Sequence, residues 1–407
     1  MAFETDILSN GIRVIHHHVN SRVAHCGLII NAGSRDEDRN EFGLAHFIEH
    51  MLFKGTKTRT SYDIADQIEA VGGEINAYTT KEDTCIHVSF LYEDYPQALE
   101  LMSDMLCNSE FPNEAMENEK QVIIDEIQAY QDTPSELIFD EYENMLFQNN
   151  PLGHNILGDP DQLRLFQKDH VLEFMNKQYV TDRIIISSVG NIGMKQLVLL
   201  AETYFGNYKT AMNGASRALA KSFVRPRYKD MEKGTFQAHC IVGSRAYPYK
   251  HENRWGLNLL NNYLCGFGFS SRLNMKLREQ AGLVYNIESV YQPYFDSGVF
   301  SIYFGTDHSH IETCLSLLYD ELEVLRNNLI EDSQLQKAKR QLKGQATMAM
   351  ENYENLMLMS GKQMYFYNTF ESLEEVYSKI ESISSAQLQM IANEILNPDN
   401  IGVLIFR

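Results

Sequence analysis

The chain has 407 residues, of which 44% are hydrophobic, and its 55 acidic residues against 35 basic ones give a formal net charge of −20. This length suffices for two or three hydrophobic cores, so a division into two domains is expected. The acidic balance argues against a nucleic-acid or anionic-membrane partner.

The N-terminal residues and the cysteines indicate the cellular compartment. The N-terminal residues form neither a basic n-region nor an apolar h-region, and no uncharged apolar run approaches the length of a membrane span. The six cysteines are scattered without a C-x-x-C pair, which predicts buried thiols in a reducing compartment. The expected location is the cytoplasm, unless a leader has been removed.

Strand-like runs alternate with long helix-like stretches. Strands are expected at 13–19, 23–32, 84–91 and 183–189, and helices near 43–54, 61–71, 94–108 and 114–148. Adjacent strands mixed with long amphipathic helices predict an α+β sandwich, not a doubly wound parallel sheet.

A second copy of this pattern follows. Ala24-His25-Cys26 recurs as Ala238-His239-Cys240, at an offset of 238 − 24 = 214, and the run 184–186 has a counterpart in 401–405. Two matches at nearly one offset predict a tandem duplication that gives two homologous α/β-sandwich domains. The expected boundaries are 1–212 for a catalytic domain, 213–229 for a linker and 230–407 for a second domain.

The first expected helix contains the pentapeptide His46-Phe47-Ile48-Glu49-His50. On a helix, His46 and His50 lie one turn apart on one face, and Glu49 faces the same pocket. This is the H-x-x-E-H motif of the inverzincins. It predicts a zinc metallopeptidase with one Zn²⁺ per chain, in which Glu49 activates the attacking water. The corresponding stretch of the second half, 259–264, contains no such set.

A catalytic zinc takes a third protein ligand. The helix-like segment 113–130 offers Glu119 and Glu126, two helical turns apart on an otherwise apolar stripe. Acids on such a stripe are unfavourable unless a cation or a hydrogen-bond partner meets them. The residues alone leave both glutamates open as ligands.

The run 74–80, after Gly72-Gly73, is a candidate edge strand that binds an extended peptide by strand addition. The expected substrate contacts are Asn76, Ala77, Tyr78 and Thr79. Backbone pairing suits short or unfolded peptides, which can be drawn out as a strand.

Together these segments resemble the pitrilysin-type inverzincins, and within them the processing-peptidase group of mitochondria and bacteria. The resemblance is carried by residues 43–56, 72–79, 151–158, 270–273 and 277–285. It implies that Glu126, at 126 − 50 = 76 residues beyond His50, is the third zinc ligand and that Glu119 supports catalysis. It also implies that Arg278 and Tyr285 reach the substrate, Tyr285 as an oxyanion donor.

In the family, a clamshell of four such domains encloses the substrate, and a two-domain chain resembles half of it. This implies a dimer, with a homodimer as the simpler expectation and a heterodimer as the alternative. A noncatalytic structural subunit, or a half-active partner whose Arg278 and Tyr285 complete a site on another chain, stays open as an alternative function. The intact ligand set favours the catalytic type.

Overall fold

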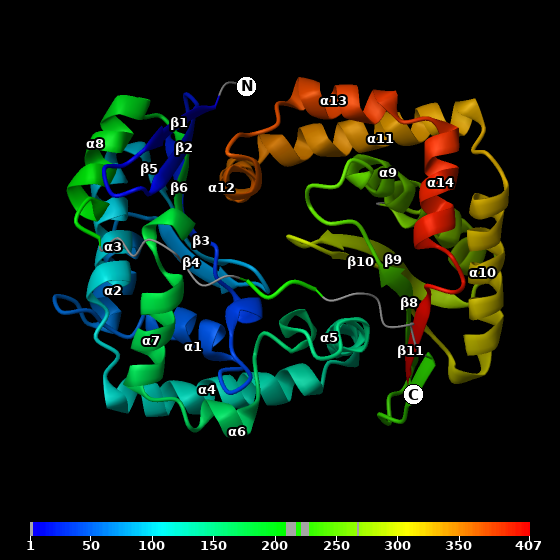
Figure 1. The fold of residues 1–407 in the computed structure, drawn as a ribbon, viewed down its shortest axis with the longest axis horizontal. Helices are drawn as coiled ribbons and strands as arrows, with labels where there is room; N and C mark the ends of the chain where they lie inside the picture. The colour runs from blue at the N-terminus through cyan, green and yellow to red at the C-terminus, as the bar shows by residue number, and fades with distance from the viewer. Residues whose placement is uncertain (1–2, 209–216, 221–227, 267) are drawn as a thin grey trace. The chain divides into compact units, whose positions relative to one another are not determined.

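The computed structural model describes residues 3–208, 217–220, 228–266 and 268–407. Most of the expected linker, 213–216 and 221–227, lies outside the described residues. The chain forms two compact units, each built around one β-sheet (Figure 1).

Unit 1 comprises Met1–Ile127, His154–Ala218 and Met348–Ser372. Its sheet has the strand order β1-β2-β6-β3-β5-β4, in which only β2 and β6 are parallel. The strands are β1 (Glu4–Ile7), β2 (Arg13–His18), β3 (Val23–Ile30), β4 (Glu74–Thr79), β5 (Thr84–Leu91) and β6 (Ile184–Gly190). The helices are α1 (Leu44–Met51), α2 (Ser61–Glu69), α3 (Tyr95–Asn108), most of α4 (Asn113–Gln131), α6 (Pro160–Leu163), α7 (Lys168–Gln178), α8 (Met194–Phe205) and α12 (Tyr353–Tyr367).

Helices cover both faces of the unit 1 sheet. Because side chains alternate along a strand, Cys26 and Leu28 of β3 enter the core formed with α1, α3 and α8. Gly27 and Ile29 point to the opposite face, where α12 packs closely against the sheet. Figure 1 shows α12 on one side of this sheet and α3 and α8 on the other.

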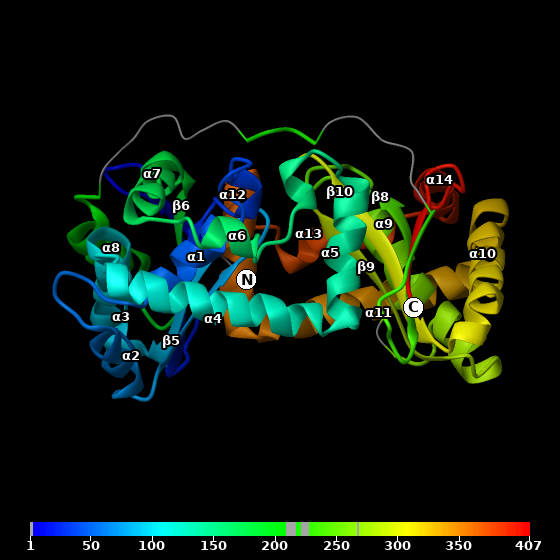
Figure 2. The same cartoon turned by 90° about the horizontal axis from the view of Figure 1, so that it is seen from below.

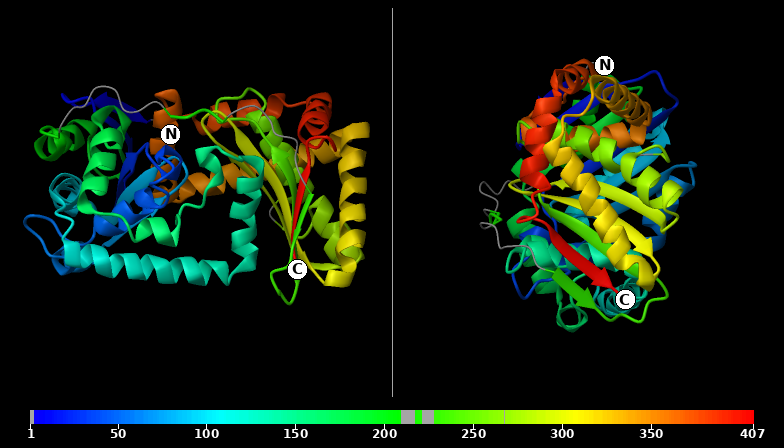
Figure 3. Two further views of the ribbon diagram at one scale, coloured as in Figure 1. Left: turned by 60° about the horizontal axis from the view of Figure 1, so that its bottom comes forward. Right: turned by 90° about the vertical axis from the view of Figure 1, so that its right-hand side faces the viewer.

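Unit 2 comprises Gln128–Gly153, Leu219–Thr347 and Leu373–Arg407. Its sheet has the order β7-β11-β8-β10-β9, in which only β7 and β11 are parallel (Figure 3). The strands are β7 (Tyr228–Met231), β8 (Ala238–Arg245), β9 (Val284–Pro293), β10 (Gly298–Thr306) and β11 (Gly402–Phe406). The helices are α5 (Pro134–Leu146), α9 (Arg254–Cys265), α10 (Ile311–Asn327), most of α11 (Asp332–Glu351), α13 (Leu373–Ser382) and α14 (Ser385–Ile395).

The two sheets share one topology. The order β2-β6-β3-β5-β4 in unit 1 corresponds strand for strand to β7-β11-β8-β10-β9 in unit 2, and in both the first two strands of this order form the single parallel pair. The predicted α+β fold with two homologous domains is therefore confirmed. In unit 2, α9 follows β8 as α1 follows β3 in unit 1.

The units are not the continuous ranges 1–212 and 230–407, because each half of the chain contributes a helix to the other unit. Helix α5, from the first half, packs on β8 and β11 of unit 2 (Figure 2). Helix α12, from the second half, packs on β3 and β6 of unit 1. There the Ser187 hydroxyl donates a 2.6 Å hydrogen bond to the Met357 carbonyl oxygen.

The cysteines and the helices answer two further expectations. All six cysteines are free thiols, and five are buried, but Cys107 on α3 is exposed, so the expectation that all are buried was wrong for this residue. Among the helices within the described ranges, none is long and apolar enough to cross a bilayer.

Candidate metal centre

Helix α1 carries both histidines of the pentapeptide. Its apolar side chains, Leu44, Ala45, Phe47, Ile48 and Met51, are buried and fix the helix against the unit 1 core. His46 is 8% exposed, and the ring centroids of His46 and His50 lie 4.5 Å apart. The i, i+4 spacing therefore places the two imidazoles next to each other on one face of the helix.

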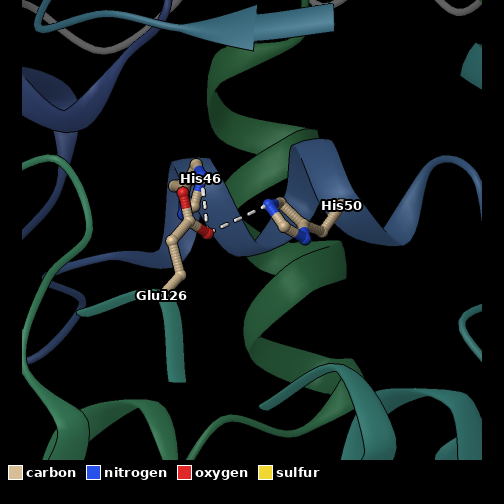
Figure 4. Close-up of side chains that lie close together, drawn as sticks. All are labelled: His46, His50 and Glu126. Atoms are coloured by element: carbon tan, nitrogen blue, oxygen red, sulfur yellow. Dashed lines mark ion pairs between the residues drawn. The ribbon is translucent and has the colours of Figure 1, made fainter. Parts of the chain in front are cut away.

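Glu126 on α4 completes a group of three. Its Oε2 lies 3.9 Å from Nε2 of His46 and 3.7 Å from Nε2 of His50 (Figure 4). These three side chains form the one group of at least three potential ligand residues found in the described part of the chain. Tetrahedral zinc with bonds of about 2.1 Å separates its ligand atoms by roughly 3.4 Å. The two distances to Glu126 exceed this value by 0.5 Å or less, and all three ligand atoms lie within 4.8 Å of one another. Two imidazole nitrogens with one carboxylate suit zinc.

Glu119 holds one of the two histidines. Its Oε1 lies 2.8 Å from Nδ1 of His50, and its Oε2 lies 2.6 Å from the Lys54 ammonium group. A carboxylate on the ring nitrogen that does not face the metal fixes the orientation of a metal-binding histidine and raises its basicity. The other histidine differs, because Nδ1 of His46 is buried without a hydrogen-bond partner among the described residues.

Glu49 lies beside the group without belonging to it. The Thr79 hydroxyl, at the end of β4, donates a 2.6 Å hydrogen bond to Oε2 of Glu49. Burial raises the pKa of Glu49, while the hydrogen bond from Thr79 opposes this effect. A carboxyl whose pKa is raised is a better proton acceptor once it is ionised.

In the metal-free protein, the pKa values of the two histidines are shifted in opposite directions. Burial, and then the neighbouring His50, lower the pKa of His46 to about 3, so this imidazole is neutral and ready to bind a metal at pH 7. Burial would also lower the pKa of His50. The hydrogen bond that His50 makes to the Glu119 carboxylate, and the charges of Glu49, Glu119 and Glu126, outweigh burial and raise it.

Strand β4 is the edge of the unit 1 sheet, and it pairs only with β5 among the described residues. Its four expected substrate contacts point to two different faces, because side chains alternate along a strand. Ala77 and Thr79 lie on the α1 side, where Ala77 packs against the core and Thr79 reaches Glu49. Asn76 and Tyr78 lie on the other face.

Arg278 and Tyr285 belong to unit 2. Arg278 lies in the π-helical segment Asn274–Gln280, and Tyr285 is on the edge strand β9 with its side chain 81% exposed. The Arg278 guanidinium lies 5.4 Å from the Tyr285 ring centroid and 4.8 Å from that of Phe269. Phe269, which the sequence analysis missed, is also exposed, so the arginine contacts two solvent-accessible aromatic rings.

This chain is similar to known proteins in family, sequence and fold. The profile described as insulinase (peptidase family M16) matches residues 13–160, and the profile described as peptidase M16 inactive domain matches residues 166–342. An uncharacterized zinc protease, YmxG, from Bacillus subtilis is 31% identical over 97% of this chain and 96% of its own length. An uncharacterized zinc protease from Rickettsia bellii is 33% identical over 99% of this chain and 97% of its own. The crystal structure of a protease from Helicobacter pylori superimposes with a TM-score of 0.93 at 20% identity, covering 100% of this chain and 99% of that one.

Proposed function

The chain belongs to peptidase family M16, and from this premise we propose that it is a zinc-dependent endopeptidase that hydrolyses extended peptides. The family predicted from the sequence motifs is confirmed, and its relatives are named zinc proteases. The observation that carries the proposal is the convergence of His46, His50 and Glu126, with the carboxylate of Glu49 beside them.

We assign one Zn²⁺ per chain to His46, His50 and Glu126. When bound there, zinc polarises the scissile carbonyl and lowers the pKa of a coordinated water toward about 7. Glu49 accepts the proton of the attacking water and returns it to the leaving amine, for which it must lie near the water rather than on the metal. Glu119 holds His50 in the ligating orientation.

Strand β4 is the proposed substrate platform. Its outer edge offers backbone groups to an extended peptide, while Thr79 joins the same strand to Glu49. Arg278 and Tyr285 are proposed, from the family resemblance, to hold a substrate carbonyl and the oxyanion. The resemblance to half of a clamshell also supports a dimer, with the homodimer as the simplest form.

The test compares the full-length wild-type protein with Glu49→Gln, using zinc analysis and cleavage of a quenched fluorescent peptide library with and without a chelator. Both proteins are expected to bind one zinc, but only the wild type should cleave peptides, and the chelator should abolish cleavage. Glu69→Gln, an exposed glutamate at the end of α2, is the matched control and should retain full activity.

Other results would exclude the proposal. A wild-type chain that binds zinc but cleaves no peptide would point to the noncatalytic or half-active subunit. Cleavage restored only by a second, different chain would identify the half-active form. Cleavage that survives both the chelator and Glu49→Gln would show that the reaction occurs elsewhere on the molecule.

A further inference from the structure

We propose that Glu37 and His154, together with Gly43 and Gly158, clamp the N-terminal turn of α1 and thereby position His46 for zinc binding. These four are positioning residues, because none of them reaches the metal ligands directly. The inference rests on the proposed zinc site.

Glu37 supplies the cap that α1 does not carry itself. The N-cap residue is Gly43, in the left-handed conformation at φ 94°, and it has no side chain that could cap the helix. Instead, Oε2 of Glu37 accepts a 3.0 Å hydrogen bond from the Gly43 amide, and Oε1 accepts a 2.8 Å bond from the Ala45 amide. The carboxyl group is buried and satisfies two of the amides that a helix start leaves free.

His154 fixes this carboxyl group from the other side. Its Nε2 lies 2.7 Å from Oε2 of Glu37. Its ring stacks on Phe42, the residue before the N-cap, with centroids 4.0 Å apart and planes 15° apart. The backbone oxygen of His154 in turn accepts a hydrogen bond from the Lys81 ammonium group. His154 therefore contacts both the cap and the residue that leads into the helix.

Two glycines allow the backbones to meet at the same place. A Cβ atom on Gly43 would lie 2.8 Å from the Leu157 carbonyl oxygen, and one on Gly158 would overlap the Phe42 carbonyl oxygen. Both glycines have positive φ, of 94° and 79°. The segment 154–158 is thus pressed directly against the start of α1, and neither position accepts a side chain without a backbone shift.

A short helix needs such a clamp. An isolated helix of only eight residues is not stable in water, so its position is set by packing and capping. His50 has Glu119 to orient it, whereas Nδ1 of His46 has no hydrogen-bond partner among the described residues. The amide that Glu37 binds belongs to Ala45, the residue directly before His46, so the cap acts on the histidine that lacks its own support.

The clamp also accounts for a sequence segment that the metal site does not use. Residues 151–158 carry part of the family resemblance, yet none of them is a zinc ligand. His154 is the first residue after the chain returns to unit 1 from Gly153 of unit 2. The returning chain therefore enters unit 1 at the start of the metal-binding helix.

The experiment measures the zinc dissociation constant of the full-length protein by chelator competition for two pairs of variants. Glu37→Leu is paired with Asp36→Leu, because the side chain of the neighbouring Asp36 is also buried but forms its ion pair with Arg217 and not with an amide of α1. Gly158→Ala is paired with Gly72→Ala, because Gly72 has a similar φ of 76° but open space around it. Both variants of the clamp should weaken zinc binding about 10- to 100-fold, the usual range for residues that support metal ligands. Both controls should stay within about threefold of wild type, whatever they do to the melting temperature.

Three results would overturn the clamp. The first is unchanged zinc affinity in Gly158→Ala or in a folded Glu37→Leu. The second is an equal loss of affinity in the controls, which would mean that general destabilisation suffices. The third comes from hydrogen exchange on the metal-free wild type, where the Gly43 and Ala45 amides should be protected and exchange at loop rates would contradict a preformed cap. A wild-type protein that binds no zinc would instead refute the proposed function, while the exchange measurement would still report on the cap.

Discussion

The Thr79 hydroxyl donates a 2.6 Å hydrogen bond to Oε2 of Glu49, which joins the edge strand β4 to the helix that carries both histidines. The bond occupies one carboxylate oxygen and leaves Oε1 for the proton of the attacking water. It also links the strand on which we place the substrate to the proposed proton acceptor. Orientation of Glu49 therefore depends on the strand that binds the peptide.

Thr79→Val should lower kcat about 10- to 100-fold, since a hydrogen bond to a charged group contributes about 1.5–3 kcal/mol. Valine keeps the β-branched shape, so KM and zinc content should change little. Thr79→Ser restores the hydroxyl and should recover most of the activity. Steady-state kinetics on one fluorescent peptide, with zinc analysis of each variant, would check this. A loss that serine does not rescue would assign the effect to packing instead.

Zinc affinity should fall as the pH falls. His50 must lose its proton to bind the metal, and its pKa is raised in the metal-free protein, whereas the pKa of His46 is lowered to about 3 and this histidine has no proton to lose near neutrality. Below the raised pKa of His50, the dissociation constant should increase about tenfold for each pH unit, corresponding to one displaced proton. Chelator competition between pH 5 and about 9 would measure the slope. A slope near two would mean that His46 is also protonated.

Glu119→Gln provides the matched test of the cause. After burial, which acts in the opposite direction, Glu119 is the main reason that the pKa of His50 is raised. Its removal should move the pH at which zinc binding weakens to a lower value. At high pH the affinity should nevertheless be about 10- to 100-fold below wild type, because the orienting carboxylate is lost. An unchanged midpoint would show that Glu119 does not control this titration.

The raised pKa of His50 also makes the stability of the metal-free protein depend on pH. Because the folded-state pKa of His50 is raised above the ordinary histidine value of 6.5, His50 stabilises the metal-free fold below about pH 6.5, and this contribution is lost as the pH rises through the raised pKa. Bound zinc would replace this lost stabilisation, because zinc binds only the folded protein. The melting temperature should therefore respond most strongly to zinc on the alkaline side of that pKa.

Local spacing in the sequence was enough to predict the pair His46 and His50, because one helical turn fixes their relation whatever surrounds the helix. The duplication was also visible, because strand residues at 24–26 recur at 238–240 and both sheets keep one topology. Glu126 and Glu119 could not be separated from spacing alone, because both lie on one face of α4. Only the three-dimensional position of α1 shows that Glu126 lies on the metal-facing side of His50 and that Glu119 contacts its Nδ1.

The sequence could not predict that α5 packs in unit 2 and α12 in unit 1. The polarity pattern of α5 or α12 predicts a buried face but does not say which of two similar sheets will cover it. The contact of Glu37 with His154 was missed because it joins residues 117 positions apart. The cap was missed because Glu37 lies outside the helix whose amides it binds. Phe269 was missed because a phenylalanine after glycine gives no periodic signal.

Two helical glycines should respond to alanine in opposite ways. On Gly361 of α12 a Cβ atom would overlap Ile29 and lie 3.0 Å from Cβ of Ser187, so Gly361→Ala should destabilise unit 1 by about 1–3 kcal/mol through overpacking. Gly344 of α11 has open space, so Gly344→Ala should stabilise its helix by about 0.5–1 kcal/mol. Chemical denaturation of both variants would measure the difference. Equal stabilisation by both would mean that α12 does not pack closely on β3 in solution.

Tyr285→Phe tests the contribution of unit 2. Phenylalanine keeps the ring beside the Arg278 guanidinium, at the 5.4 Å separation of the present pair, and removes only the hydroxyl. If that hydroxyl donates to the oxyanion, kcat should fall about 10²- to 10³-fold, while zinc affinity and the melting temperature stay at wild-type values. Tyr319→Phe on α10 is the control for removal of a partly exposed tyrosine hydroxyl, and it should leave kcat unchanged. A Tyr285→Phe variant with full kcat would remove Tyr285 from the proposed mechanism.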